Sequence, residues 1–478
     1  MPHPRGGLMA ATPPRISSTT LLPLYLAHSF SHVLLGIYPA VLFVLRQRFH
    51  ASYTLLGGVF TAATLVYGLG AFPTGLLLNR WHPLTVIRVC LVLAAAAAGV
   101  VAAAPSAGVM AIGLVLLGLA CSPYHTAANT MISRVSGNDA RLTAHHGMFG
   151  SLGLALALFG TVFTYAAAVG QSGTGELPSF NWSHFMLVAG QLDPRLIRLA
   201  FVFVLVGYGT KAGLAPMHTW LPDAHSEAPS PTSAMLSGVS LKIAVYALIR
   251  FHILATRCLG SEYSGTLLLC FGLFSMFLAT PFILVQNNLK RMLAYSSLEH
   301  VGLICVAIGL NTPMTVFGGL LHMGYHALTK PVLFFAAGNI HQAFHTLKLR
   351  VIGPGVAKVL PGTALLMGLA AAAAMGLPPF GLFYTELTVL SGGFAAGRTA
   401  VSALALAALV AAFCGMLKQL TRILTGKPRI ARTTDFGRWE GLPAMALLLG
   451  ALLVFSLWIP ATLLQLIQQA AGVIGGVP

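Results

Sequence analysis

Apolar residues form long, nearly uninterrupted runs along this chain, and short polar loops separate the runs. Each run has the roughly 20 residues that a helix needs to cross the hydrocarbon core of a bilayer. The pattern predicts an all-α polytopic membrane protein with about thirteen transmembrane helices. The expected spans are residues 20–45, 54–78, 84–104, 107–131, 143–168, 196–217, 231–250, 264–286, 290–310, 313–340, 360–395, 399–424 and 442–470.

Two of these runs contain helix-breaking residues at membrane depth. The run 196–217 is interrupted by the sequence GTKAGLAP at 209–216, and the run 360–395 is interrupted by MGLPPFG at 375–381. Glycine and proline at such depths release backbone groups that must find water or protein partners. Because paired broken helices are typical of inverted-repeat transporters, we expect two discontinuous helices and an ion pathway in the C-terminal part.

Composition narrows the class of protein. Hydrophobic residues make up 56% of the 478 residues, charged residues only 8%, and the mean hydropathy is +0.82, which excludes an ordinary globular enzyme. The formal charge of +17 comes largely from short loops beside apolar spans, so membrane topology explains it better than nucleic-acid binding. The first apolar run, from Leu21, is too long for a signal-peptide core and is expected to remain as an anchor.

Cofactor motifs are not found in the sequence. The six cysteines are scattered singly, without metal or redox spacing, and we interpret them as free thiols and small apolar fillers (Cys90, Cys121, Cys258, Cys270, Cys305, Cys414). There is no iron–sulfur cysteine cluster, no dinucleotide glycine fingerprint and no haem-attachment motif. The prediction is therefore a protein with no cofactor, no resident metal and no redox centre of its own.

The loop charges predict an orientation. With a cytoplasmic N terminus, the inner loops hold Arg80, the pair Lys290-Arg291 and the basic run 418–438, whereas the outer loops hold few basic residues. This asymmetry favours a cytoplasmic N terminus and an external C terminus. The expected location is the inner (cell) membrane of a bacterium.

Ionisable residues inside apolar spans are the candidate chemistry. Lys211 lies at the first helix break, and Lys242 lies near the middle of the next span. An ammonium group at this depth costs roughly 2.5–3.5 kcal/mol on insertion scales, so it indicates water, a partner or a function. The predicted role is proton exchange by both lysines, and the alternative is that they are structural, Lys211 as a lysine snorkelling from a helix end.

A second group recurs every four residues. His322, His326 and Lys330 share one helical face, and imidazoles both accept and donate protons near neutral pH. We predict a proton relay, with structural hydrogen bonding as the alternative. A metal site is disfavoured, because an ammonium group adjoins the histidines and no third acidic or thiol ligand is evident.

Two carboxylates complete the candidate set. Glu299 stands beside His300 shortly after the inner pair Lys290-Arg291, which predicts either proton uptake or pairing with a lysine. Glu386 follows the second helix break, where a carboxylate facing apolar neighbours has few passive explanations. At the inner membrane edge, PMHTWLPDAH at 216–225 either hydrates the path or forms a loop hydrogen-bond network.

Four motifs from about residue 181 onward support a family resemblance. TKAGLAPMHTWLPDAHSEAPSPTSAMLSG, NNLKRMLAYSSLEHVG, GGLLHMGYHALTKPVLFFAAGNI and MGLPPFGLFYTEL resemble the antiporter-like proton-channel subunits of respiratory complex I, and most closely the component F group of membrane-bound hydrogenase 4. The resemblance implies that Lys211, Lys242 and Glu386 carry protons through two half-channels, and that Glu386 gates proton release to the outside. It also implies other membrane subunits and a peripheral redox arm as partners.

The first 165 residues differ in style. HSFSHVLLGIYPAVLFVL, GLLLNRW and HHGMFGSLGLALALFG resemble the opening helices of the major facilitator superfamily, with Asn79 where that family has an aspartate. We therefore predict a partial facilitator-like segment at 1–168, a junction loop at 169–195 and an antiporter-like domain at 196–478.

One departure concerns the first half-channel. The resemblance implies that its lysine pairs with a glutamate on the family's fifth helix, yet the spans before residue 196 contain no carboxylate. We predict an impaired first channel and an intact second one, unless a partner subunit supplies the acid. The leading prediction is a proton-translocating, non-redox subunit of an oxidoreductase complex. The alternatives are a stand-alone cation/proton antiporter or ion-coupled transporter and a facilitator-type solute exporter.

Overall fold

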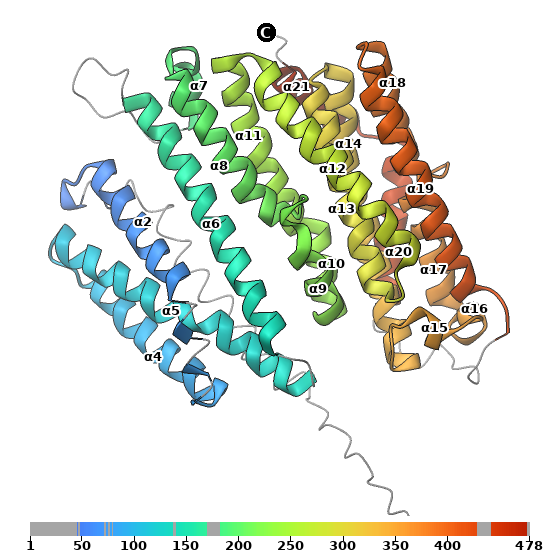
Figure 1. The fold of residues 1–478 in the computed structure, drawn as a ribbon, viewed down its shortest axis with the longest axis horizontal. Helices are drawn as coiled ribbons and strands as arrows, with labels where there is room; N and C mark the ends of the chain where they lie inside the picture. The colour runs from blue at the N-terminus through green and yellow to red at the C-terminus, as the bar shows by residue number, and fades with distance from the viewer. Residues whose placement is uncertain are drawn as a thin grey trace, which may run out of the picture. The chain divides into compact units, whose positions relative to one another are not determined.

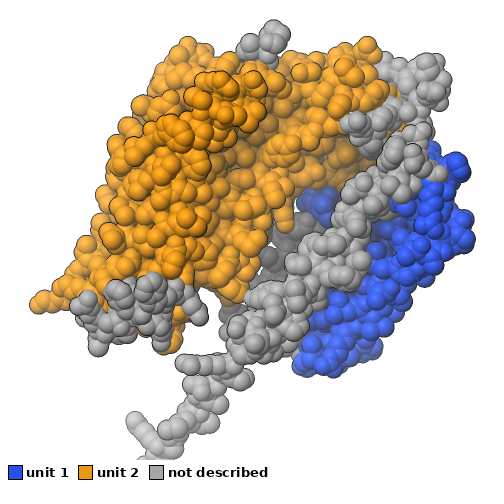
Figure 2. Space-filling model, turned by 180° about the vertical axis from the view of Figure 1, so that it is seen from behind, with its two compact units in different colours: residues 1–155 blue, residues 156–478 orange. Residues whose placement is uncertain are grey.

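Helices and short connecting segments make up the described part of this chain in the computed structural model (Figure 1). The structure describes residues 45, 48–70, 73–74, 77–78, 80–136, 140–169, 182–427 and 441–475. Most of the predicted first span, together with Gly75, Asn79 and the junction residues 170–181, lies outside these ranges. The chain divides into two compact units, Met1–Ala155 and Leu156–Pro478 (Figure 2).

The first unit contains α2 (Tyr53–Leu69), α4 (Pro83–Ala102), α5 (Ala107–Ser136) and the start of α6 (Ala140–Val169). α5 packs against both α2 and α4. Gly118 permits the closest approach, since a Cβ at this position would lie 2.3 Å from the carbonyl oxygen of Ala63. The buried residues of this unit are mainly alanine and leucine, as expected for helices that pack through small side chains in a membrane.

The second unit holds the remaining helices. They are α7 (Trp182–Leu187), η1 (Ala189–Gln191), α8 (Pro194–Ala212), η2 (Met217–Thr219), α9 (Trp220–Glu227), α10 (Ser230–Met235), the π-helix η3 (Leu236–Ser240), α11 (Leu241–Leu259), α12 (Ser261–Val285), α13 (Leu289–Leu310), α14 (Pro313–Phe344), α15 (Leu349–Ile352), α16 (Val356–Val359), α17 (Pro361–Ala374), α18 (Gly381–Ala395), α19 (Thr399–Leu424), α20 (Leu442–Leu457) and α21 (Ala461–Ile474).

Local sequence signals set several of these boundaries. Asp193 caps α8 by accepting a hydrogen bond from the Arg195 N–H at 2.8 Å, and α8 ends at Gly213, which has a left-handed φ of 77°. Thr312 forms a capping box with Thr315 at the start of α14. The second predicted break is present as well, because six residues separate α17 from α18.

α13 is the centre of the second unit. Nearly all of its residues are buried, and it packs against α12, α14, α9, α11, α18 and α19. In the described part of the chain, seven helices are long and apolar enough to cross a membrane, or eight if α20 and α21 count as one bent span. The predicted span at 442–470 corresponds to α20 and α21, which meet at 74° around Trp458 and Pro460.

Candidate functional site

Lys242 is buried at the start of α11, directly after the π-helix η3. Only 8% of its surface is exposed. Its ammonium group donates a hydrogen bond to the carbonyl oxygen of Ser237 and lies 2.5 Å from Nδ1 of His326. A π-helical turn shifts the regular hydrogen-bond register, which leaves a carbonyl available for such a partner. The sequence prediction of a deeply buried lysine is confirmed for this residue.

The predicted stripe on α14 also lies in the protein interior. His322, His326 and Lys330 are each 0% exposed. Lys330 donates hydrogen bonds to the carbonyl oxygen of Leu293 at 3.1 Å and to Oγ of Ser296 at 2.8 Å, so this face of α14 contacts α13. The spacing of four residues therefore places three ionisable groups along one buried helix contact.

His300 connects this stripe to the rest of the site, although the sequence pattern marked it only as a neighbour of Glu299. Its Nδ1 lies 3.0 Å from Nε2 of His322, and its ring centroid lies 4.8 Å from that of His326. Three imidazoles from α13 and α14 thus form one buried cluster. The signal for His300 was present in the motif YSSLEHVG, where it follows a buried glutamate.

Thr385 sets the protonation of His322, and sequence reasoning did not identify it. Its hydroxyl donates its single proton to the carbonyl oxygen of Leu382 at 2.9 Å, so it accepts a hydrogen bond from Nδ1 of His322, also at 2.9 Å. The other nitrogen of His322, Nε2, then carries a lone pair. This lone pair accepts a hydrogen bond from the Nδ1–H group of His300. Nε2 of His300 therefore also carries a lone pair, and this atom has no hydrogen-bond partner.

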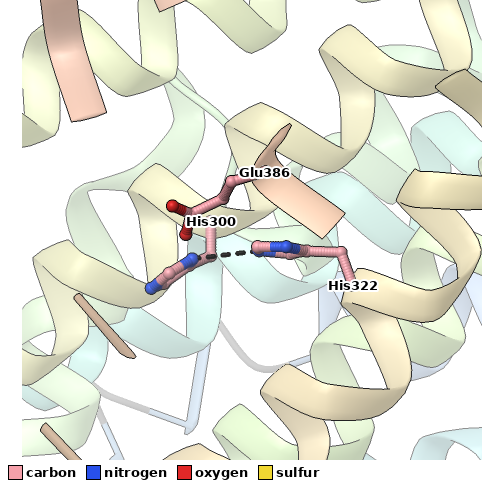
Figure 3. Close-up of side chains that lie close together, drawn as sticks. All are labelled: His300, His322 and Glu386. Atoms are coloured by element: carbon pink, nitrogen blue, oxygen red, sulfur yellow. Dashed lines mark hydrogen bonds between the residues drawn. The ribbon is translucent and has the colours of Figure 1, made fainter. Parts of the chain in front are cut away.

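Glu386 approaches the histidines from α18, after the second helix break (Figure 3). One ligand atom each from Glu386, His300 and His322 lies within 4.8 Å of the others. The carboxylate rests against Gly376, where a Cβ would overlap it. The glycine of the break therefore makes room for the carboxylate at the histidine cluster.

Glu299 lies on the other side of His300. It is 3% exposed, and its Oε2 lies 3.9 Å from Nε2 of His300. A small cavity borders both Glu299 and Glu386 and is otherwise lined by apolar residues of α19 together with Ala374 and Met375. Glu299 stands ten residues into α13, about 15 Å along the helix axis from Leu289.

Lys211 lies in the last turn of α8, directly before the first helix break, at the place that the sequence predicts. It is exposed, and within the described part of the chain no hydrogen bond or ion pair involves it. The structure therefore does not bring Lys211 into the cluster of Lys242, the histidines and Glu386. In α9, Asp223 forms an ion pair with Arg291, whereas His225 is fully buried, stacked on Phe334 with a centroid distance of 4.5 Å.

Replacing Gly376 by alanine tests the placement of Glu386. Gly376 has a φ of +64°, and the new methyl group would displace the carboxylate, so we expect proton transfer through the chain to slow by about tenfold or more. Gly397→Ala is the matched control, because Gly397 has a φ of +74° and no atom within 4 Å of the position that an added methyl group would take. Equal transfer rates in the two variants, measured as acidification of vesicles, would contradict this placement.

Comparison with known proteins agrees with this architecture. Residues 140–412, more than half of the chain, match the family model described as NADH:quinone oxidoreductase/Mrp antiporter, transmembrane. The chain belongs to this antiporter family. It is an integral membrane protein related to the antiporter-like subunits of complex I, Mrp and hydrogenase 4.

Individual relatives of the antiporter family show how far the likeness extends. A hydrogenase-4 component F homolog from Methylacidiphilum infernorum is 41% identical over 284 residues, which is 59% of this chain and 59% of that protein. The chain thus spans about three fifths of the length of this relative.

Solved structures show the fold over a longer stretch. A chain of the membrane-bound sulfane sulfur reductase, an archaeal respiratory membrane complex, has a TM-score of 0.63 at 22% identity and covers 95% of this chain and 98% of its own. A chain of respiratory complex I from Thermus thermophilus has a TM-score of 0.62 at 22% identity, with 88% and 98% covered.

These matches bear on the first 165 residues. A single chain of the sulfane sulfur reductase covers 95% of the chain described here, so the likeness in fold extends over both compact units. None of the relatives named above is a major facilitator. The comparisons therefore give no evidence of the predicted facilitator-like segment, and the family match at residues 140–412 begins within it.

Proposed function

We propose that this chain conducts protons across the membrane as a non-redox subunit of a respiratory complex related to complex I or hydrogenase 4. The observation that carries the proposal is a file of ionisable groups, buried from Lys242 through the three histidines and partly buried at Glu386. Neighbouring groups lie at 2.5 Å (Lys242 to His326) and 3.0 Å (His300 to His322), and a ring-centroid distance of 4.8 Å joins the two pairs. Isolated ionisable groups are costly in a membrane, so an unbroken series indicates a pathway.

The geometry suggests how a proton moves along this file. Lys242 donates its proton to Nδ1 of His326 and keeps the Ser237 carbonyl as a partner. His326 contacts His300, whose Nδ1 passes a proton to Nε2 of His322. Glu386 then accepts the proton beside the small cavity and releases it. His326 and His300 each accept at one nitrogen and donate from the other, whereas His322 keeps its Nδ1 proton on Thr385 and passes the received proton on from Nε2.

The first half-channel is proposed to be impaired. Lys211 is exposed and has no carboxylate partner among the described residues, so no neighbouring charge modulates its proton affinity. The second half-channel, in contrast, contains all of its predicted groups in one cluster. Transport would therefore pass through the file from Lys242 to Glu386 alone, unless a partner subunit supplies an acid near Lys211.

The loop charges support an orientation for this transport. The exposed basic residues Arg350, Lys358 and Arg422 lie in α15, α16 and the end of α19, Lys348 directly precedes α15, and both short helices contact α19. We propose that this side faces the cytoplasm and that Glu386 releases protons to the outside of a bacterial inner membrane. The relatives and solved structures named above belong to multi-subunit respiratory complexes, which supports membrane subunits and a peripheral redox arm as partners.

The test is purification of the chain with its partners, followed by reconstitution in sealed vesicles. We expect a redox-active partner to copurify, and electron transfer to change the internal pH in a way that a protonophore abolishes. A redox-active complex that leaves the internal pH unchanged would refute the proposal. A chain that purifies alone and exchanges sodium for protons without a redox partner would favour the stand-alone antiporter instead.

A further inference from the structure

His300, His322 and Glu386 have the composition and spacing of a transition-metal site (Figure 3). The sequence alone disfavours a metal here because no third acidic ligand is evident, and the helix break supplies one in Glu386. Two imidazole nitrogens and one carboxylate oxygen are a common ligand set for zinc, with water in the fourth position. We propose that this cluster binds one Zn²⁺ ion, which takes the place of the proton shared by His300 and His322 and thereby blocks proton transfer.

The distances fit a tetrahedral ion with little rearrangement. Bonds of about 2.0 Å at tetrahedral angles place ligand atoms roughly 3.3 Å apart. The two imidazole nitrogens are already 3.0 Å apart, and all three ligand atoms lie within 4.8 Å of one another. Rotation of the Glu386 side chain, which is only partly buried, would close the remaining gap.

The neighbouring groups hold the two histidines in a metal-binding state. Thr385 accepts the Nδ1 proton of His322, so that Nε2 is free to bind the ion. When Nδ1 of His300 binds the ion, the proton of that ring moves to Nε2, which is buried without a partner and faces Glu299 at 3.9 Å. With zinc bound, this N–H group would face the Glu299 carboxylate as its acceptor. Histidines that bind zinc usually donate their second N–H to such a group.

The charges allow a divalent ion. Glu386 as ligand and Glu299 as second neighbour supply two negative charges for the two positive charges of Zn²⁺. Lys242 and Lys330 oppose the ion when protonated, and their hydrogen bonds go to groups other than the three ligands: Lys330 bonds to Leu293 and Ser296, and Lys242 bonds to Ser237 and His326. The small cavity beside Glu299 and Glu386 offers space for the fourth ligand, a water molecule.

The blocking effect rests on the proposed proton pathway, whereas zinc binding does not. An ion bound to His300 and His322 occupies both of the lone pairs through which the proton would pass. Proton transfer should then stop while the partner subunits remain assembled. Binding and transport are therefore measured separately on the same preparation.

Direct metal binding tests the site. The complex is stripped of loosely held metal with a chelator and titrated with ZnCl₂, and with CoCl₂ for the visible absorption of a four-coordinate site. We expect the unmodified chain to bind one more Zn²⁺ ion per chain than the Glu386→Gln variant. The zinc affinity should be at least about tenfold lower in Glu386→Gln and in His322→Gln than in the unmodified chain. The glutamine replacements preserve side-chain size, and gel filtration checks that each variant still assembles.

The chain offers a matched control in His341 and His345, an exposed pair at the end of α14. The double variant His341→Ala/His345→Ala should keep the zinc affinity and the Co²⁺ spectrum of the unmodified chain. Loss of binding in this control, or unchanged affinity in both glutamine variants, would overturn the site. Zinc that binds as expected but leaves proton transfer at its full rate would overturn the block. If no proton transfer occurs even without zinc, the proposed function fails, and the binding titration still decides whether the site exists.

Discussion

Replacing Lys242 by methionine should abolish the redox-driven pH change in reconstituted vesicles. Methionine keeps most of the side-chain volume but removes the ammonium group that bonds to Ser237 and His326. Nδ1 of His326 then loses its proton donor on α11. Nε2 of the same ring has no hydrogen-bond partner that could replace it. We expect the rate of internal acidification to fall by at least about tenfold, which corresponds to about 1.4 kcal/mol or more in the barrier.

The control for this prediction is Lys358→Met, in the exposed helix α16. It makes the same chemical change outside the buried file and should leave acidification unchanged. Electron transfer by the partner subunits should continue in both variants, which separates lost transport from lost assembly. Acidification at the full rate in the Lys242→Met complex would show that protons do not pass through this lysine.

Sequence reasoning located the ionisable groups that are close in the chain. His322, His326 and Lys330 follow one another at four-residue spacing, and helix geometry alone places them on one face. Lys242 and Glu386 were identified because a charge in an apolar run is costly enough to require a reason. The two helix breaks were visible for a similar reason, since glycine and proline interrupt the backbone pattern wherever the helix packs.

Contacts between distant segments were not predictable in this way. Thr385 fixes the tautomer of His322 across 63 residues, and nothing about an isolated threonine in an apolar helix indicates this. The same holds for His252, a buried histidine that joins Ser264 at 2.9 Å and Asn311 at 3.3 Å and so ties α11 to α12 and α13. The exposure of Lys211 also depends on how helices pack, which the local sequence does not encode.

α12 packs closely against α13, the helix that carries Glu299 and His300. Gly265 and Gly272 on α12 face Gly309 and Gly302 on α13, with the same seven-residue spacing on both helices. A Cβ at Gly302 would lie 2.7 Å from the carbonyl oxygen of Gly272. Small residues at such a seam allow two helix backbones to approach closely and gain van der Waals contact in a membrane.

Gly302→Ala should therefore destabilise the chain. The added methyl group meets a backbone oxygen, so one helix must move, and overpacking of this kind costs about 1–3 kcal/mol. Glu299 and His300 lie within one turn of Gly302, so the movement would also disturb their distances to His322 and Glu386. We expect a lower melting temperature in detergent and a lower yield of assembled complex.

Gly324→Ala is the matched control, because Gly324 lies in helix α14 with nothing within 4 Å of a methyl group, and helix propensity favours alanine by up to about 1 kcal/mol. Equal melting temperatures for the two alanine variants would show that the glycine seam does not fix the position of α13.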